Sequence, residues 1–155
     1  MKISLIVIGK KMPDWLEDGI THYVKQMPPS MNFSLVAIDA PKRKGRNIDQ
    51  IKKIEGDLLT AASMDSNIVI AFDEKGIQNT TKDIANNLHN WQQNGDKVSL
   101  LIGGADGLSS ECKSSANQLW GLSNLTLPHS IARLLAVEQI YRANSILINH
   151  PYHRQ

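Results

Sequence analysis

Two segments near the end of the chain contain residues that could do chemistry. Residues 103–107, Gly-Gly-Ala-Asp-Gly, follow directly on the apolar run 98–102. Glycines allow a backbone to approach a ligand closely, and in α/β proteins ligands bind beyond the carboxyl ends of strands. The chain then ends with side chains that can move protons or stabilise a developing anion, namely His150, Tyr152, His153 and Arg154. We therefore predict an active site in residues 98–155.

The spacing of the glycines argues against two common cofactor motifs. Gly103, Gly104 and Gly107 do not fit the dinucleotide fingerprint G-x-G-x-x-G, and the chain contains no G-x-x-x-x-G-K-[ST] phosphate loop. A ligand without phosphate, such as S-adenosylmethionine, suits this loop better. The alternative is that the glycines only satisfy a tight turn that requires positive φ.

Metal chemistry is not favoured by the residue types. His150 and His153 could suggest a metal, but no cysteine or carboxylate cluster completes a ligand set, so we predict no metal site. A metal-dependent hydrolase is disfavoured for the same reason. The single cysteine, Cys112, cannot form an internal disulfide, which fits a reducing compartment.

The amino-terminal residues predict a strand and not a targeting segment. The apolar run before Gly9 is short and no small-residue cleavage pattern follows it. No stretch approaches the roughly 18 apolar residues that a membrane span requires. We therefore expect a cytoplasmic protein without a membrane segment.

Positive charge is concentrated in one part of the chain. The formal net charge is only +2, so the charge of the whole molecule does not demand a nucleic-acid partner. Between residues 42 and 53, which we call the basic segment, Asp49 is the only acidic residue. The basic residues there are Lys42, Arg43, Lys44, Arg46, Lys52 and Lys53. This pattern fits either a solvated loop or a contact with phosphates.

The elements that must position these residues alternate between strand and helix. Apolar runs predict strands at residues 3–8, 33–38, 67–72 and 98–102, and helical spacing predicts helices after Pro13, from Ile48 and after Thr80 or Thr81. This alternation predicts an α/β fold with a mostly parallel sheet flanked by helices. A chain of 155 residues suits one domain, residues 1–155.

The last third is expected to contain two helices with a short strand between them. Ser109 or Ser110 is predicted to cap a helix that includes Leu119. The alternation within residues 122–130 predicts a short strand. The final helix is expected from about Ile131, with Ile148 on its core side. Its charged residues could form an ordinary surface ion pair, and they are Arg133, Glu138 and Arg142.

Four ordered segments resemble one known family. The segments LLIGGADGLS, LSNLTLPH, ARLLAVEQIYRA and NHPYHR together resemble the ribosomal RNA large-subunit methyltransferase H family of the SPOUT class. The segment GKKMPDW and the total length fit as well. The resemblance covers essentially the whole chain.

The resemblance implies a fold, an activity and a cofactor. It implies a SPOUT-type fold with a deep C-terminal trefoil knot, a rare exception to the rule that protein chains are unknotted. It further implies a homodimer that uses S-adenosylmethionine to methylate N3 of a pseudouridine in large-subunit (23S) ribosomal RNA, on assembled ribosomes. The cofactor-binding residues that it implies are Phe72, Asp73, Gly103, Gly104, Leu122, Ser123, Asn124, Leu125, Thr126 and Leu127.

The resemblance also suggests catalytic roles. Arg142 and Arg154 suit a cation that stabilises the base as N3 loses its proton, and His153 suits the proton acceptor. Tyr152 could stack on the base or orient it. Glu138, on the same helix as Arg142, completes the predicted catalytic set.

Some features stay open beside these roles. Asn144 stands where the family often has tryptophan, so helix packing and substrate contact are both open for it. Lys42, Arg43, Lys44 and Arg46 could contact ribosomal phosphates, which would make binding sensitive to salt. A non-enzymatic ribosome-binding or RNA-binding factor is the alternative function.

Overall fold

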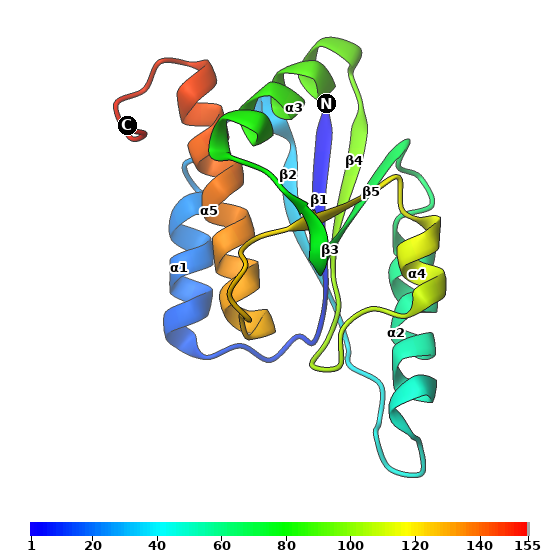
Figure 1. Cartoon of the computed structure of the whole chain (residues 1–155). Helices are drawn as coiled ribbons and strands as arrows, with labels where there is room; N and C mark the ends of the chain where they lie inside the picture. The colour runs from blue at the N-terminus through cyan, green and yellow to red at the C-terminus, as the bar shows by residue number, and fades with distance from the viewer. Residues whose placement is uncertain (155) are drawn as a thin grey trace.

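Strands and helices alternate along the whole chain (Figure 1). The structure is a computed structural model that describes residues 1–154. The strands are β1 (Lys2–Ile8), β2 (Phe33–Ile38), β3 (Ile68–Gln78), β4 (Lys97–Ile102) and β5 (Gln118–Gly121). The helices are α1 (Asp14–Val24), the 3-10 helix η1 (Pro29–Met31), α2 (Ile48–Ala62), α3 (Thr81–Asn94), α4 (Ser110–Ser115) and α5 (His129–Leu147). The predicted α/β class is confirmed.

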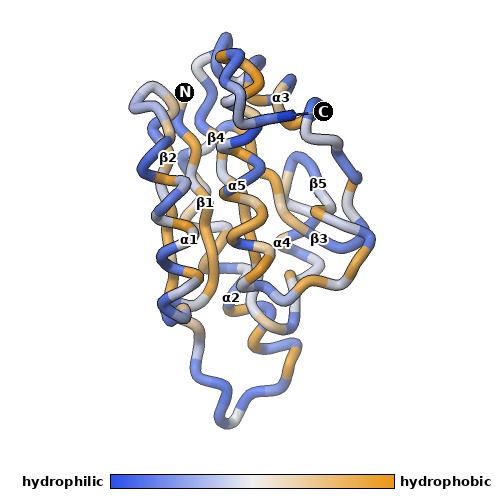
Figure 2. Tube along the Cα trace, turned by 90° about the vertical axis from the view of Figure 1, so that its left-hand side faces the viewer, coloured by the Kyte–Doolittle hydropathy of each residue, from blue (hydrophilic) through white to orange (hydrophobic). Residues whose placement is uncertain are grey.

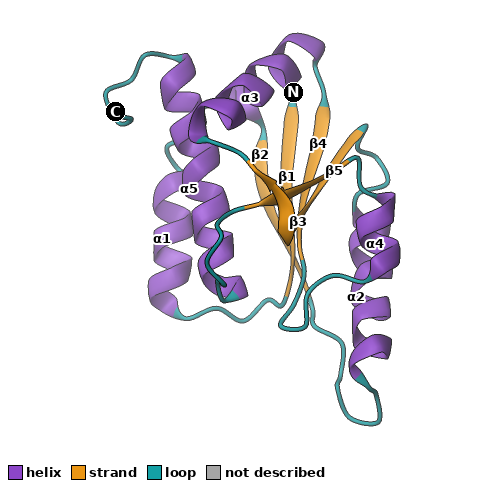
Figure 3. Cartoon of the chain, viewed as in Figure 1, coloured by secondary structure: helices purple, strands orange, loops and turns teal. Residues whose placement is uncertain are grey.

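The five strands form one sheet in which every pairing is parallel. The strand order is β2-β1-β4-β3-β5, and Ile3 of β1 is in register with Phe33 on one side and Val98 on the other. The carboxyl ends of parallel strands meet at one edge of a sheet. The loops that follow β1, β2 and β4 accordingly gather at the same end of the molecule (Figure 3).

Helices cover both faces of the sheet and bury two apolar clusters. Ile3, Leu5 and Val7 pack with residues of α1, α3 and α5, whereas the alternate residues Ile6 and Ile8 pack with residues of α2 and α4. This alternation is the two-residue period of a strand covered on both sides. Apolar residues follow the strands and α5, whereas the tip that carries much of the basic segment is hydrophilic (Figure 2). Within residues 1–154, no helix is long and apolar enough to cross a membrane.

Capping residues mark the beginnings of α2 and α3. Thr80 accepts a hydrogen bond from the Asp83 backbone N–H at the start of α3, and the Asp83 carboxylate accepts one from the Thr80 backbone. Asn47 and Gln50 form the same reciprocal pair at the start of α2. Such caps satisfy backbone N–H groups that have no partner inside the helix. The predicted cap at Thr80 is thus confirmed.

Strand β3 is longer than the sequence predicts. The apolar run predicts a strand that ends at Phe72, before the polar residues Asp73, Glu74 and Lys75. In the structure, the pairing of β3 with β5 breaks after Phe72 and resumes at Ile77. Gly76 makes this irregularity fit, because a Cβ there would lie 2.5 Å from the Trp120 carbonyl carbon. The polar residues therefore lie inside an irregular strand.

The predicted elements between residues 110 and 130 need two corrections. Leu119 lies on β5 and not in the predicted helix, because α4 ends at Ser115. Asn117 then fixes the chain to β3: its side chain accepts from the Val69 N–H (2.6 Å) and its N–H donates to the Val69 carbonyl (2.8 Å). Residues 122–127 are a loop and not the predicted strand, because residues 118–121 take the place beside β3.

Helix α5 also differs from its prediction at both ends. It begins at His129, two residues earlier than expected, and it ends at Leu147. Ile148 follows the helix with 61% of its surface exposed, so it does not lie on the core side. Arg133 is fully buried and therefore forms no surface ion pair. Asn144 is buried as well, which favours helix packing over substrate contact.

The close approach at Gly76 gives a prediction for stability. The substitution Gly76→Ala should lower the free energy of unfolding by about 1–3 kcal/mol, because the new Cβ meets backbone atoms that cannot move aside. Gly19→Ala in α1 is the control, since its Cβ would meet only the flexible Leu134 side chain at 3.3 Å. Chemical denaturation of both variants measures the effect. An equal loss in both would contradict the account of β3.

Candidate active site

A pocket of about 680 Å³ lies at the carboxyl end of β4, beside the irregular part of β3 and the loop after β5. This volume suits a ligand of cofactor size. Three segments that are distant in sequence converge here, although Phe72 and Asp73 lie within β3 and not in the predicted loop after a strand. The predicted cofactor residues that line it are Phe72, Asp73, Gly103, Gly104, Leu122, Ser123, Leu125, Thr126 and Leu127. Asn124 is exposed and is not part of the lining.

Gly103 and Gly104 are required for space and not for positive φ. Among the glycines of this loop only Gly107 has a positive φ, +82°. A Cβ on Gly103 would lie 2.9 Å from a Leu108 methyl group, and a Cβ on Gly104 would lie 2.5 Å from the Glu55 carboxyl. The turn interpretation therefore holds for Gly107 alone. The backbones of the first two glycines, packed closely from behind, line the pocket.

The charges that line the pocket are balanced. Its acidic residues are Asp73, Glu74 and Asp106, and its lysines are Lys52, Lys75 and Lys113. Two of the acids are paired: Asp106 with Arg43 (2.7 Å) and Asp73 with Lys113 (3.7 Å). A polyphosphate would require an excess of positive charge. The observed balance suits a ligand that carries both ammonium and carboxylate groups, as S-adenosylmethionine does.

His129 lines the pocket and lies close to the buried Arg133 side chain. It is the first residue of α5. Arg133 is 1% exposed and donates to the backbone carbonyls of Ile8 and Gly9 at the end of β1. Desolvation and then the Arg133 charge lower the pKa of His129. A neutral imidazole is thereby favoured at the pocket, and such a group can accept a proton.

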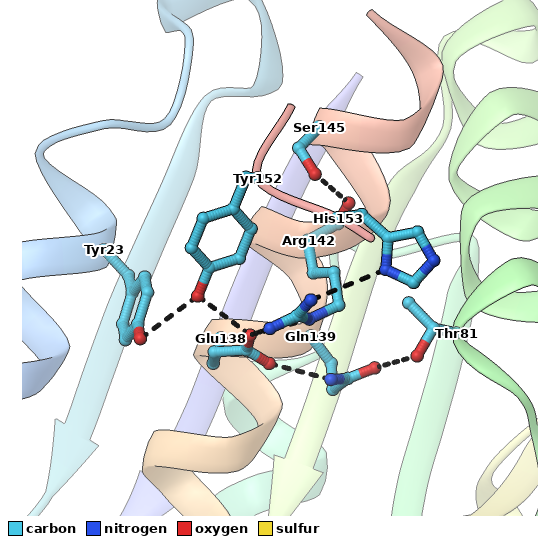
Figure 4. A network of polar contacts seen from close by, with 8 residues as sticks. All are labelled: Tyr23, Thr81, Glu138, Gln139, Arg142, Ser145, Tyr152 and His153. Carbon is cyan, nitrogen blue, oxygen red and sulfur yellow. Dashed lines mark hydrogen bonds and ion pairs between the residues drawn. The ribbon is translucent and has the colours of Figure 1, made fainter. Parts of the chain in front are cut away.

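The predicted catalytic residues form one hydrogen-bonded network at the other end of α5 (Figure 4). Glu138 Oε1 accepts from Arg142 (2.6 and 2.8 Å) and from the Tyr152 hydroxyl (3.0 Å). Arg142 lies 3.5 Å from His153 Nδ1. Arg154 follows in the tail and is exposed. Four of the five predicted residues are thus brought together, and the fifth is adjacent in sequence.

Tyr152 anchors the tail to the body of the protein. Its ring contacts Tyr141 edge to face at 4.7 Å between centroids, and the Arg142 guanidinium lies over it at 4.6 Å. Its hydroxyl also lies 3.2 Å from the hydroxyl of Tyr23 on α1. Desolvation and these hydrogen bonds raise the pKa of Tyr152, so the phenol stays neutral. With its ring covered in this way, Tyr152 orients His153 and Arg154.

Glu138 holds this network together. Besides the bonds to its Oε1 atom, Oε2 accepts from Gln139 (2.7 Å), and Gln139 in turn accepts from Thr81 at the start of α3 (2.7 Å). Both carboxylate oxygens are therefore occupied. Arg142 has its pKa raised chiefly by the hydrogen bond to Glu138. The geometry gives Glu138 the role of positioning Arg142 and Tyr152.

The pocket and the tail network lie apart within one chain. Ala132 lines the pocket, and Arg142 is ten residues further along the same helix. At 1.5 Å per residue, about 15 Å separates them along the axis. Figure 1 likewise shows the tail at the end of α5 opposite to the loops. A single chain therefore does not bring the two predicted halves of the site together.

Glu55 and His129 are site residues that the sequence reasoning missed. Glu55 is 4% exposed, and its Oε1 atom has no hydrogen-bond partner within the described chain. One sequence feature marks it, because it lies four residues from both Ile51 and Leu59 on an otherwise apolar helix face. His129 directly follows the Leu-Thr-Leu-Pro segment, and only the fold shows that it lines the pocket.

Comparisons with known proteins agree with this geometry. Residues 1–153 match the family described as Predicted SPOUT methyltransferase. The chain belongs to the SPOUT methyltransferase family. SPOUT methyltransferases use S-adenosylmethionine, so the family implies this cofactor. The part of the recognition that concerns the class of enzyme is thereby confirmed.

Solved structures of low sequence identity share the fold of this chain. A probable methylase family protein from Haemophilus influenzae Rd KW20 is 14% identical, with a TM-score of 0.64 over 99% of this chain and 70% of that chain. A probable methyltransferase from Bordetella pertussis Tohama I is 15% identical, with a TM-score of 0.60 over 92% and 95%. TrmJ from Z. mobilis ZM4 is 16% identical, with a TM-score of 0.58 over 94% and 71%.

The buried Glu55 of this SPOUT protein gives a prediction for stability against pH. Burial and then the Asp106 charge raise the pKa of Glu55 above its ordinary value near 4.5, opposed by the Gly104 backbone and by Arg43. Above pH 4.5 the Glu55 carboxyl of the unfolded chain loses its proton, whereas the folded chain keeps the proton up to the raised pKa. The free energy of unfolding therefore falls as pH rises between these two pKa values. Glu55→Gln cannot ionise and should gain stability relative to wild type over this range.

Urea denaturation of both proteins from about pH 4, where the carboxyl is largely protonated in both states, up to about pH 7 measures this difference. Asp57→Asn removes a charge from the exposed side of the same helix and controls for net charge. A wild-type protein that gained stability relative to Glu55→Gln as pH rises would contradict the prediction.

Proposed function

We propose that this SPOUT protein methylates N3 of a pseudouridine in large-subunit (23S) ribosomal RNA, using S-adenosylmethionine and accepting assembled ribosomes. The support for the substrate is the resemblance of the ordered segments around Gly103, Leu122, Arg133 and His150. The observation that carries the chemistry is the pocket, which three segments containing predicted cofactor residues line together. Its balanced charges fit a ligand without phosphate.

The chemistry requires an activated methyl group and a base positioned in line with it. When bound, S-adenosylmethionine supplies a methyl group at a sulfonium centre. The protein then contributes mainly by holding the reacting atoms in line, which can account for much of the rate. The Gly103 and Gly104 backbones and the loop at residues 122–127 are the parts of this chain that would orient the ligand.

Proton removal from N3 is assigned to the tail and to the pocket mouth. Arg154, which is exposed, and Arg142 stabilise the negative charge that develops on the base. His153, 3.5 Å from Arg142, is the proposed proton acceptor. His129 is a second candidate for this role, because it lines the pocket and its pKa is lowered.

We infer a homodimer in which one chain supplies the pocket and its partner supplies the tail. The separation of about 15 Å along α5 supports this arrangement, because methyl transfer requires the two halves to meet. Trp15 on α1 is 57% exposed, and Ile148, which directly follows α5, is 61% exposed. An interface along α1 and α5 would cover these apolar side chains. The deep C-terminal trefoil knot is proposed for this chain on the strength of its family.

The basic segment is proposed to contact ribosomal phosphates. Its tip is hydrophilic and extends away from the sheet (Figures 1 and 2). Lys42, Lys44 and Arg46 have no ion pair within the described chain, whereas Arg43 is paired with Asp106. Contacts of this kind predict an affinity for ribosomes that falls as the salt concentration rises.

The tail residues give the first prediction for activity. His153→Ala and Arg154→Ala should lower the rate of methyl transfer to ribosomes by about 100-fold at saturating cofactor, because each removes a group that acts on the base. Tyr152→Phe loses the hydroxyl that binds Glu138 and should lower the rate by about tenfold. Lys82→Ala, on the exposed side of α3, is the control. Full rates in all three tail variants would remove the tail from the site.

Mixing two inactive variants tests the shared site. Gly104→Val displaces the glycine loop of the pocket, because its side chain would collide with Glu55, and Arg154→Ala removes the tail cation. Random exchange of subunits makes half of the dimers mixed, and one of the two sites in each mixed dimer is intact, so about a quarter of wild-type activity should return. Methyl transfer is measured before and after mixing. No recovery, with subunit exchange confirmed by mass spectrometry, would contradict a site shared between subunits.

The non-enzymatic alternative is tested by calorimetry. A methyltransferase should bind S-adenosylmethionine in the pocket, and Gly104→Val should abolish that binding because its side chain would collide with Glu55. A ribosome-binding factor that lacks cofactor binding would show no specific heat with the wild-type protein. That result would favour a non-enzymatic ribosome-binding factor over a methyltransferase.

A further inference from the structure

We propose that Glu55 is a positioning residue that sets the place of the Gly104 backbone in the cofactor pocket. The proposal rests on the proposed binding of S-adenosylmethionine there. Glu55 belongs to α2 and is not among the residues that line the pocket, so it lies behind the glycine loop. It acts on the ligand through Gly104.

The Glu55 carboxyl lies directly against the Cα atom of Gly104. A Cβ built on Gly104 would lie 2.5 Å from Oε2, 3.0 Å from Oε1 and 3.1 Å from Cδ of Glu55. A side chain at residue 104 would therefore have to displace the buried Glu55 carboxyl. The carboxyl therefore fixes how far the Gly104 peptide can withdraw from the pocket.

The next residue of α2 supports the other end of the same loop. A Cβ on Gly56 would lie 2.5 Å from Ser109 Oγ and 3.3 Å from Cys112 Cβ. Ser109 Oγ accepts from the Cys112 N–H (3.2 Å) and so begins α4. Two consecutive residues of one helix thus contact the loop at residue 104 and at residue 109. Helix α2 is the support on which the loop rests.

The chemical character of Glu55 is unusual for a residue that only fills space. It is 4% exposed and its Oε1 atom has no partner within the described chain, although an apolar side chain of similar size would avoid this desolvation cost. Asp106, on the same loop, lies close enough to act on its charge, and Arg43 pairs with Asp106 at 2.7 Å. The glycine loop thus contacts the Glu55 carboxyl at Gly104 and the Arg43 guanidinium at Asp106.

The functional consequence is the orientation of the ligand. Gly104 accepts a hydrogen bond from the Gly107 N–H (3.1 Å), so a shift at residue 104 moves the whole turn. A pocket that works by positioning is sensitive to displacements of about 1 Å. Loss of Glu55 should therefore weaken ligand binding even though it touches no ligand atom.

Calorimetric titration of the full-length protein with S-adenosylmethionine tests the proposal. Glu55→Ala should raise the Kd about tenfold, whereas Glu55→Gln, which keeps the shape, should stay within about threefold of wild type. Gly104→Ala should raise the Kd at least about tenfold, because its Cβ meets the carboxyl. The double variant Glu55→Ala/Gly104→Ala should bind at least about fivefold more tightly than Gly104→Ala alone, since removal of the carboxyl makes room for the methyl group at residue 104. Asp57→Asn is the matched control on the same helix.

Hydrogen exchange of the amides at residues 103–108, measured without ligand, gives a second and independent readout. Faster exchange in Glu55→Ala than in Asp57→Asn supports the proposal. If Glu55→Ala does not fold, Glu55→Met, which keeps the volume without the carboxyl, replaces it in both measurements. Glu55→Met should show the same weaker binding and faster exchange.

The outcomes separate this proposal from the proposed function. Tight binding by the wild type together with equally tight binding by Glu55→Ala, or no recovery in the double variant, overturns the positioning role alone. Absence of binding by the wild type overturns the proposed function. In that case the exchange measurement still decides whether Glu55 holds the loop, and unchanged exchange overturns it.

Discussion

Parallel pairing of all five strands is the constraint on which the rest of the structure depends. It brings the irregular part of β3 and the loops after β4 and β5 together at one edge of the sheet, so that segments distant in sequence line a single pocket. Helix α2 packs closely behind the glycine loop, because a Cβ on Gly104 would meet the Glu55 carboxyl and a Cβ on Gly56 would meet Ser109. We propose that this packing holds the loop in place for a ligand.

The second half of the site depends on a different interaction. Glu138 collects hydrogen bonds from Arg142, Tyr152 and Gln139, and this one carboxylate joins the tail to α5 and, through Gln139, to α3. A chain end that would otherwise fray is thereby ordered. This network lies at the far end of α5 from the pocket, and the proposed homodimer would bring the two halves together.

Much of the fold could be predicted from the sequence, because strands buried on both faces read as continuous apolar runs. The runs at residues 3–8 and 98–102 predicted most of β1 and of β4 for this reason. Local pattern failed where tertiary contacts decide. Strand β3 continues through the polar residues 73–75 because its pairing with β5 resumes at Ile77. After α4 the chain joins the sheet at Asn117, whose side chain accepts a hydrogen bond from the Val69 N–H.

The candidate site shows the same division. Glycine spacing and the unusual tail indicated which residues to examine, and the family resemblance indicated the loop at residues 122–127. Neither could show that Gly104 is a glycine because of Glu55, since that contact joins residues far apart in the sequence. Nor could local sequence place the pocket and the tail at opposite ends of one helix, which is a property of the folded chain.

The proposed reaction is the transfer of a methyl group to a pseudouridine of the large ribosomal subunit. The direct measurement is methyl transfer from S-adenosylmethionine to ribosomes that lack the modification, followed by mass mapping of the ribosomal RNA. The account predicts one added methyl group on a single pseudouridine of the large-subunit RNA. No incorporation of methyl into these ribosomes would contradict it.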